Sequence, residues 1–276
     1  MRLLAAGSIA LDSLKGPFGS VQGELGGSAL YFSLAASLIA PLEICAPVGR
    51  NDLERVNRIV GDRPIDLSRL TVLDHPTYRW SARQESGTNH DLGGQDSIYD
   101  EWKPSLPPGF DGWAFVGSMR PDRQAEIVRA LSETRLLAGD SMQSYVTARP
   151  AEAEEVLSAC DWFFANEAET RALGGDPASP DEFRRRWGIA GLVVKAGPEG
   201  CTVWTDAGRV HVPAMESGRV VDVTGAGDAL AGGMLARWST TGGAASGLAD
   251  AIAHGVACAA LAISDVGLAG LARSTR

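Results

Sequence analysis

Lysine is almost absent from this sequence. Its 25 basic residues include only three lysines, at positions 15, 103 and 195, while Asp and Glu number 34, which leaves a net charge of −9. A protein that binds a nucleic-acid backbone presents a basic face, so this balance argues against nucleic acid as a partner. It does not exclude an anionic small molecule, because a loop can bind phosphate locally through backbone amides.

Paired cysteines and membrane segments are lacking as well. The four cysteines lie far apart and form no C-x-x-C motif, which favours buried reduced thiols over disulfides or a zinc site. The apolar run that opens the chain soon reaches Gly7 and Asp12, and we expect no apolar stretch of about 18 residues after it. These features predict a cytoplasmic protein without a membrane partner.

Two common nucleotide-binding motifs are missing. A dinucleotide fingerprint needs a third glycine where Leu230 stands, and no glycine is followed by Lys-Ser or Lys-Thr as a P-loop requires. A dehydrogenase with a dinucleotide fold therefore lacks its signature, and a test for bound NAD would decide that alternative.

Short β-like runs alternate with longer segments that carry apolar residues at helical spacing. The β-like runs span residues 2–8, 43–49, 112–118, 135–140, 161–166, 192–197 and 219–225. The helical segments span residues 28–40, 120–134, 149–159, 179–188 and 246–264, the last as one long buried helix or a pair. This alternation predicts an α/β fold with a mostly parallel sheet covered by helices.

Two stretches interrupt this alternation. Residues 11–25 and 72–105 contain glycine, proline and short alternating segments that are typical of strands and turns. We expect them to form one small β domain that stands off an α/β core made of residues 1–10, 26–71 and 106–276.

The β-like runs end in polar or small residues, and ligands bind beyond the carboxyl ends of strands in an open parallel sheet. The last run leads into TGAGD, where Gly225, Ala226 and Gly227 can turn their amides toward an anion at a helix N-terminus. Asp228 follows in the first helical turn, a position that acids favour for the helix dipole alone. Alternatively, the loop stabilises a moving phosphoryl group while Asp228 accepts the proton of the attacking hydroxyl.

The segment VVDVTGAGDALAGGML (220–235) resembles the C-terminal signature of the ribokinase/PfkB family of sugar and nucleoside kinases. Further matches are the double glycine Gly26-Gly27, NEAE at 166–169 and VVKAGPEG at 193–200, so the resemblance spans essentially the whole chain. It implies a ribokinase-like three-layer α/β/α sandwich in which the two interrupting stretches form a β lid. It also implies an ATP-dependent kinase that uses Mg²⁺.

The resemblance assigns roles to individual residues. Asp228 matches the catalytic base, and Gly225, Ala226 and Gly227 match the anion hole. The positions that match substrate-binding residues are Asp12, Gly26, Gly27 and Asp140. The positions that match the nucleotide site are Asn166, Glu169, Lys195, Gly197, Gly200, Thr224 and His254. Glu169 would organise Mg²⁺ through water, and Asp222 lies where the family often has a monovalent cation such as K⁺.

Several of these residues also have purely structural interpretations. Asn166 and Glu169 form a good capping pair for the helix that follows them. Gly197 and Gly200 fit a plain turn, and a lone histidine among apolar residues, such as His254, is more often a packing residue.

The acceptor depends on which face of the run TYRWSAR (77–83) meets the pocket. In a strand, Arg79 and Arg83 point to one face, and Tyr78 and Trp80 point to the other. A basic face would suit an anionic sugar, an aromatic face would suit a nucleobase, and two solvated arginines are equally compatible. We expect a sugar or sugar derivative bound with the help of Arg79; the alternatives are a nucleoside kinase and a non-catalytic ligand-binding homologue.

The expected lid has consequences for water and for assembly. Closure over the acceptor would exclude water and so prevent hydrolysis of ATP. A small sheet with one partly apolar face commonly pairs with a second copy, which predicts a homodimer joined through the lids.

Overall fold

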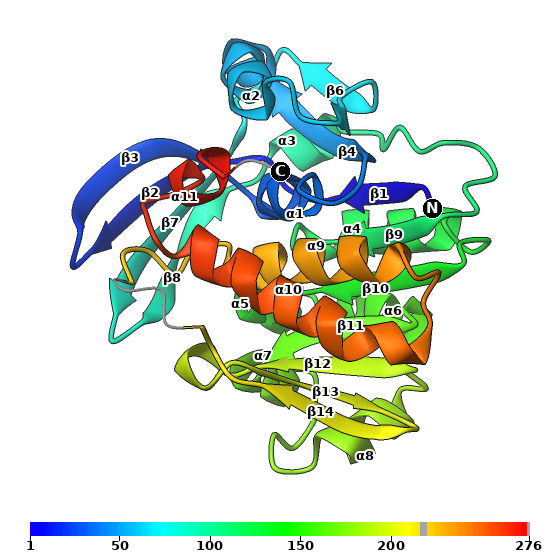
Figure 1. Cartoon of the computed structure of the whole chain (residues 1–276). Coiled ribbons are helices and arrows are strands. Elements are labelled where there is room, and N and C mark those ends of the chain that lie inside the picture. Colours follow the sequence, from blue (N-terminus) through cyan, green and yellow to red (C-terminus); the bar gives the residue numbers. More distant parts are fainter. Residues whose placement is uncertain (216–219, 275–276) are drawn as a thin grey trace.

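The central sheet of the protein is mostly parallel, as the alternating pattern predicts. The computed structural model describes residues 1–215 and 220–274. Eight of its described strands run parallel, and six of them form its centre: β1 (Leu3–Ala6), β4 (Leu42–Gly49), β9 (Trp113–Val116), β10 (Leu136–Asp140), β11 (Trp162–Asn166) and β12 (Gly191–Lys195). The antiparallel strands β13 (Cys201–Thr205) and β14 (Gly208–Val212) extend one edge, and the short strands β5 (Ile65–Asp66) and β6 (Leu70–Leu73) pair with β4 at the other. The order β14-β13-β12-β11-β10-β9-β1-β4-β5 places β1 well inside the sheet (Figure 1).

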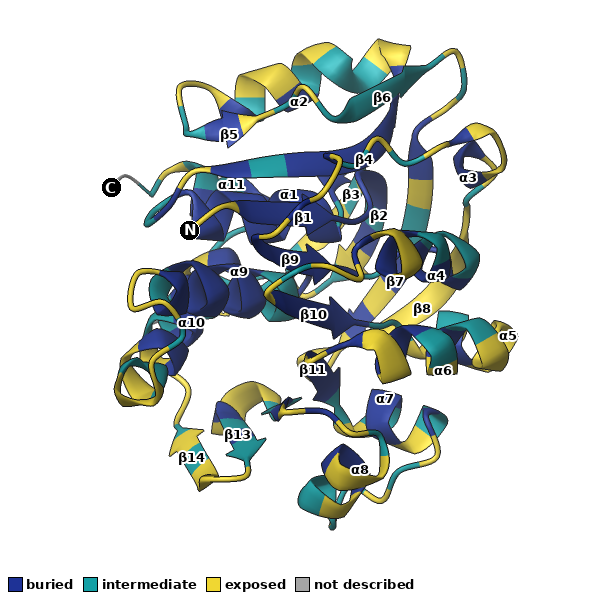
Figure 2. Ribbon diagram, turned by 90° about the vertical axis from the view of Figure 1, so that its right-hand side faces the viewer, coloured by how far each residue is buried: buried dark blue, intermediate teal, exposed yellow. Residues whose placement is uncertain are grey.

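Helices cover both faces of this sheet, as Figure 2 shows from the side. One layer contains α1 (Ser28–Ala36), α9 (Ala226–Ser239), α10 (Leu248–Ala262) and α11 (Ala269–Ala272). The other contains α4 (Pro121–Ala130), α5 (Gln143–Ala148), α6 (Pro150–Ala159), α7 (Glu167–Ala172) and α8 (Pro180–Arg186). Residues of β1 alternate between the two cores, with Leu3 and Ala5 in one and Leu4 and Ala6 in the other. This is the three-layer α/β fold that the sequence indicates.

A second, four-stranded sheet stands beyond the carboxyl ends of the parallel strands, on the left in Figure 1. It contains β2 (Ala10–Gly16), β3 (Gly19–Gly26), β7 (Tyr78–Glu85) and β8 (Thr88–Gln95), in the order β3-β2-β7-β8. The two interrupting stretches meet through the parallel pair β2–β7, with Leu11 opposite Arg79.

Not all of residues 72–105 lies in this sheet. Residues 72–73 belong to β6, which pairs with β4. After β8, the short helix α3 (Ile98–Glu101) and Trp102 pack into the main core, where Tyr99 and Trp102 are fully buried. The small sheet is therefore narrower than the stretch of sequence that suggested it, because large aromatic side chains draw the return segment into the core.

The structure differs from two further expectations. Residues 220–225 form no strand, because the amide of Val221 donates to the carbonyl of Ile263 (2.8 Å) instead of joining a ladder; residue 219 lies outside the described residues. An apolar window of 18 residues does exist at Ala245–Ala262, with mean hydropathy 1.4. It meets the length and composition of a membrane span, but here it forms η3 (Ala245–Gly247) and α10, and α10 packs along α9.

Candidate active site

A cavity lies between the small sheet and the carboxyl ends of the parallel strands. It brings together residues from β2, α1, β7, β8, α5 and the start of α9, which are far apart in sequence. Its lining residues are Ser8, Ala10, Asp12, Gly27, Ser28, Tyr31, Tyr78, Trp80, Asn89, Ser118, Met142, Tyr145, Thr224, Gly225 and Asp228. Both ends of the TGAGD segment and Asp12 therefore face one hollow.

The TGAGD segment forms the N-terminus of α9. Gly225 is the N-cap with φ 73°, and a Cβ at this position would collide with the ring of Tyr31, so the turn requires glycine for both conformation and space. The amide of Ala226 makes only a long hydrogen bond of 3.4 Å to Val223, and within the described chain the amide of Gly227 has no partner. Free amides at the positive end of a helix can bind an anion.

Asp228 lies in the first turn of α9, beside these amides. Burial, followed by the charge of Asp140, raises the pKa of its carboxyl to about 8; Glu169 contributes to this rise and Lys195 opposes it. A carboxyl whose pKa is near neutrality is well matched to accepting a proton from a substrate hydroxyl.

Asp12 lies on β2 and is 3% exposed. A Cβ on Gly26 would lie against Asp12 Oδ2, so the glycine leaves space for this carboxylate. Burial, and then the charges of Asp222 and Asp228, raise the pKa of Asp12 to about 8. A buried carboxyl that faces a cavity can exchange hydrogen bonds with substrate hydroxyls.

Lys195, at the end of β12, joins two carboxylates at the carboxyl edge of the sheet. Its Nζ lies 2.9 and 2.8 Å from the two oxygens of Asp140, at the end of β10, and 3.3 Å from Glu169 Oε2. Asp140 and Glu169 are only 3% and 7% exposed. Two buried acids thus converge on one cation next to Asp228.

The convergence of Asp140 and Glu169 is the arrangement that a divalent cation would need. Carboxylate oxygens suit Mg²⁺, which usually binds through one or two carboxylates together with substrate phosphates. Within residues 1–215 and 220–274 no group of three or more His, Cys, Asp or Glu residues could hold a metal. A magnesium ion at this pair would therefore need phosphate oxygens and water to complete its coordination.

Asn166 and Glu169 also form the capping box that their spacing suggests. Asn166 Oδ1 accepts from the amide of Glu169 (2.9 Å), and Glu169 Oε2 accepts from the amide of Asn166 (2.8 Å). The cap and the contact with Lys195 use the same carboxylate, so the structural and functional interpretations of this pair coexist.

Asp222 has two backbone partners. Its Oδ1 accepts from the amide of Thr224 (2.9 Å) and its Oδ2 accepts from the amide of Gly267 (3.0 Å), and the residue is 1% exposed. These bonds fix the segment before α9 against the turn after α10.

The strand β7 presents its aromatic face to the cavity. Tyr78 and Trp80 are lining residues, whereas Arg79 and Arg83 are exposed on the opposite face. The expected role of Arg79 in substrate binding thus differs from the structure, because strand alternation turns its side chain to solvent when Tyr78 and Trp80 face inward.

Of the seven residues assigned to the nucleotide, only Thr224 lines this cavity; Asn166, Glu169 and Lys195 lie beside it in the cluster described above, and three others lie apart from both. Gly197 and Gly200 form a closed turn after β12, with a hydrogen bond of 3.0 Å from the amide of Gly200 to the carbonyl of Gly197. His254 lies on α10, half-buried, with its Nε2 3.7 Å from the sulfur of Cys258. None of these three is among the residues that line the cavity.

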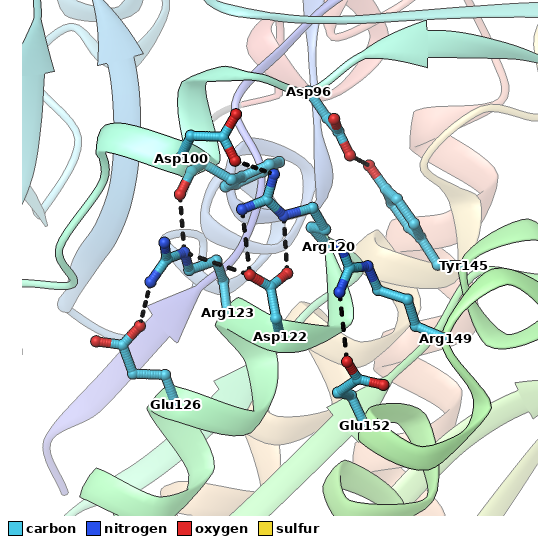
Figure 3. A network of polar contacts seen from close by, with 10 residues as sticks. Asp96, Asp100, Arg120, Asp122, Arg123, Glu126, Tyr145, Arg149 and Glu152 are labelled. Atoms are coloured by element: carbon cyan, nitrogen blue, oxygen red, sulfur yellow. Dashed lines mark hydrogen bonds and ion pairs between the residues drawn. The ribbon is translucent and has the colours of Figure 1, made fainter.

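A polar network secures the segment that returns from β8 to the core (Figure 3). Arg120, at the start of α4, donates to both oxygens of Asp122 and to Asp100 Oδ1 (2.7 Å). Tyr145, from α5, donates to Asp96 Oδ2 (3.3 Å) just after β8. Because Tyr145 also lines the cavity, this network joins the cavity wall to the base of the small sheet.

The sequence did not single out several lining residues. Asn89 of β8 donates to Thr224 Oγ1 (2.9 Å), so the tip of the small sheet touches the segment before the anion-binding turn. The amides of Ser8 and Ser28 each donate to the hydroxyl of the other residue, at 3.0 and 3.1 Å. Their only signal in the sequence is position: Ser8 lies four residues before Asp12, and Ser28 directly follows Gly27.

Comparison with known proteins gives a consistent result. Residues 113–274, more than half of the chain, match the model of the pfkB family of carbohydrate kinases. An ATP-dependent ribose-1-phosphate kinase of Halopiger xanaduensis is 34% identical over 148 residues, which cover 52% of this chain and 46% of that protein, about half its length. A cytidine kinase of Thermococcus kodakarensis is 25% identical over 255 residues, 86% of this chain and 88% of that protein.

Solved structures share the fold. A nucleoside kinase of Methanocaldococcus jannaschii, described as an archaeal member of the ribokinase family, has a TM-score of 0.75 at 20% identity, covering 96% of this chain and 92% of its own. A double mutant of a Vibrio cholerae fructokinase, bound to fructose, ADP and a potassium ion, has a TM-score of 0.76 at 20% identity, with 98% and 94% covered.

Proposed function

Because this chain belongs to the pfkB family of carbohydrate kinases, we propose that it transfers the γ-phosphoryl group of ATP to a hydroxyl of a small polyol. The observation that carries this proposal is a cavity lined by Asp12, by Gly225 at the N-cap of α9 and by Asp228 in the first turn of that helix. A hydroxyl acceptor, a phosphoryl group and a base can meet there.

In the proposed mechanism, Asp12 orients the acceptor through its hydroxyls and Asp228 takes the proton of the attacking hydroxyl. The amides of Gly225, Ala226 and Gly227 stabilise the negative charge on the phosphoryl group during transfer. Mg²⁺, held near Asp140 and Glu169 partly through water, would neutralise charge on the phosphates. As the hydroxyl oxygen gives its proton to Asp228 and bonds to the γ-phosphorus, the bond between that phosphorus and the bridging oxygen of ATP breaks, which yields the phosphate ester and ADP.

The aromatic wall of the cavity favours a nucleoside over a free sugar as the acceptor. Tyr78, Trp80 and Tyr145 offer rings on which a nucleobase can stack, and the arginines of β7 face away from the cavity. The cytidine kinase relative supports this class, whereas the ribose-1-phosphate kinase and fructokinase relatives keep a sugar as the second candidate.

The test is phosphoryl transfer from Mg·ATP to a panel of nucleosides, free sugars and ribose 1-phosphate, with the Asp228→Asn variant as the inactive control. We expect turnover of at least one nucleoside at a rate that exceeds that of every sugar. Turnover of sugars alone would reverse the choice of acceptor, and absence of transfer to any of them would contradict the kinase assignment.

We further propose that the small sheet acts as a lid and that the chain forms a homodimer in which the lids meet. Leu92 on the outer strand β8 is 62% exposed, and an edge strand with exposed apolar side chains tends to pair with another chain. Light scattering at micromolar concentration tests the assembly, and a monomer would contradict it. We also propose that the protein is cytoplasmic and that a monovalent cation binds near Asp222.

A further inference from the structure

All three lysines lie within the described residues, and among them Lys195 alone is enclosed by acidic groups. Its side chain is 17% exposed and lies among Asp140, Glu169 and Asp228, whereas Lys103 is exposed. A buried charge is strongly destabilising unless it is paired, so the ammonium and the two carboxylates hold one another in place.

The ammonium occupies the point on which the two carboxylates converge. Both oxygens of Asp140 lie within 2.9 Å of Nζ, and Glu169 Oε2 lies at 3.3 Å. The same oxygens are the hard ligands that a divalent cation would use. Lys195 and a metal ion therefore compete for one pair of carboxylates.

Lys195 also reaches the first turn of α9. A Cβ built on Gly227 would lie 3.1 Å from Lys195 Cδ and 3.2 Å from its Nζ, so the lysine packs closely against this turn and a side chain at Gly227 would crowd it. A phosphate bound to the amides of this turn would be a second anionic partner for the ammonium. A lysine can change partner without leaving the site, because it is a point charge on a flexible stem.

We infer that Lys195 is a positioning residue that holds Asp140 and Glu169 in place of a divalent cation until the nucleotide arrives. It thereby makes tight metal binding depend on the nucleotide, whose phosphates attract the ammonium and release the carboxylates. Coupling of this kind is reciprocal, so the metal also strengthens nucleotide binding. The inference rests on the proposed function only for the identity of the second ligand, a nucleotide.

The test is a titration of the nucleotide-free protein with Mn²⁺ alone, in which electron paramagnetic resonance measures the concentration of the free ion. We expect Lys195→Met to bind Mn²⁺ about tenfold or more tightly than the wild type, because a competing buried cation has been removed. Lys103→Met, the same change at an exposed lysine, should bind like the wild type. The double variant Lys195→Met/Asp140→Asn should not show this increase in Mn²⁺ affinity, because only one carboxylate of the pair remains.

Equal Mn²⁺ affinity in Lys195→Met and the wild type would overturn the inference. If Lys195→Met does not fold alone, its refolding in millimolar Mn²⁺ decides the question: restored folding supports replacement of the ammonium by the metal, and failure to fold overturns it. Neither measurement involves an acceptor or turnover. The inference can therefore fail while the kinase assignment stands, and the reverse also holds.

Discussion

Replacement of Asp228 by asparagine tests the proposed base through both activity and stability. The amide keeps the size of the carboxyl and loses its basicity. We expect phosphoryl transfer to fall by about 10²- to 10⁴-fold, the usual contribution of a positioned base, with little change in nucleotide affinity. A residual rate above about a tenth of the wild type would refute the role of Asp228.

The same substitution should make the nucleotide-free protein more stable than the wild type, and the difference in free energy of unfolding should increase as the pH rises. In the folded state the pKa of Asp228 is raised from its ordinary 3.8 to about 8, first by burial and then by Asp140 and Glu169. The unfolded chain therefore loses this proton near pH 4 and the folded protein only near pH 8, so wild-type stability falls through that window. Each unit of pKa corresponds to about 1.4 kcal/mol; since Asp228 is partly exposed to water, we expect a net gain of about 1–3 kcal/mol at pH 8.5.

Urea unfolding at pH 5 and pH 8.5 measures this difference directly. The free energy of unfolding of Asp228→Asn should exceed that of the wild type by more at pH 8.5 than at pH 5. Asp250→Asn is the matched control, because Asp250 lies in the first turn of α10 with its side chain 61% exposed and paired with Arg237. An advantage of Asp228→Asn that is the same at both pH values would show that the folded protein does not favour the neutral carboxyl, and would refute the reasoning.

Three other substitutions probe the remainder of the site. Glu169→Gln should raise the Mg²⁺ concentration needed for half-maximal transfer, and an unchanged titration would leave only its helix-capping role. Gly225→Ala should lower the free energy of unfolding by about 2–4 kcal/mol, because its Cβ meets the ring of Tyr31, whereas Gly242→Ala, at positive φ but with open space, should cost only about 1 kcal/mol in urea unfolding. Trp80→Ala should raise KM for a nucleoside by about tenfold and leave KM for a free sugar nearly unchanged, and equal effects on both would argue against base stacking.

Much of the scaffold could be predicted because its signals are local. Alternation of apolar runs sets the strands and helices, and the glycine spacing around Gly225 marks a turn that few other sequences can form. The strand expected at 219–225 is absent from residues 220–225, because an apolar run alone does not say whether a neighbouring strand is free to pair. The backbone partner of Val221 is instead Ile263 at the end of α10, which is a tertiary contact.

The side of the cavity that would bind the acceptor could not be predicted either, because it too depends on tertiary contacts. Alternation separates Arg79 from Trp80 on the two faces of β7, but which face meets the cavity depends on how the small sheet sits on the core. The contact between Lys195 and Asp140 was easier to predict, because both residues end parallel strands of one sheet and so lie at the same edge. The order of those strands, which brings the two side chains together, is set by the whole fold.

The all-buried helix α1 has a consequence for biosynthesis. Every residue of α1 is buried in the finished protein, and part of its cover is α9, which begins only at Ala226. At a synthesis rate of about 5–20 residues per second, roughly 10–40 s pass between the appearance of these two helices at the ribosome. During that interval the growing chain carries an apolar helix whose permanent partner does not yet exist. Substitutions that weaken the α1–α9 contact should therefore reduce the yield of soluble protein in the cell before they alter any property of the folded enzyme.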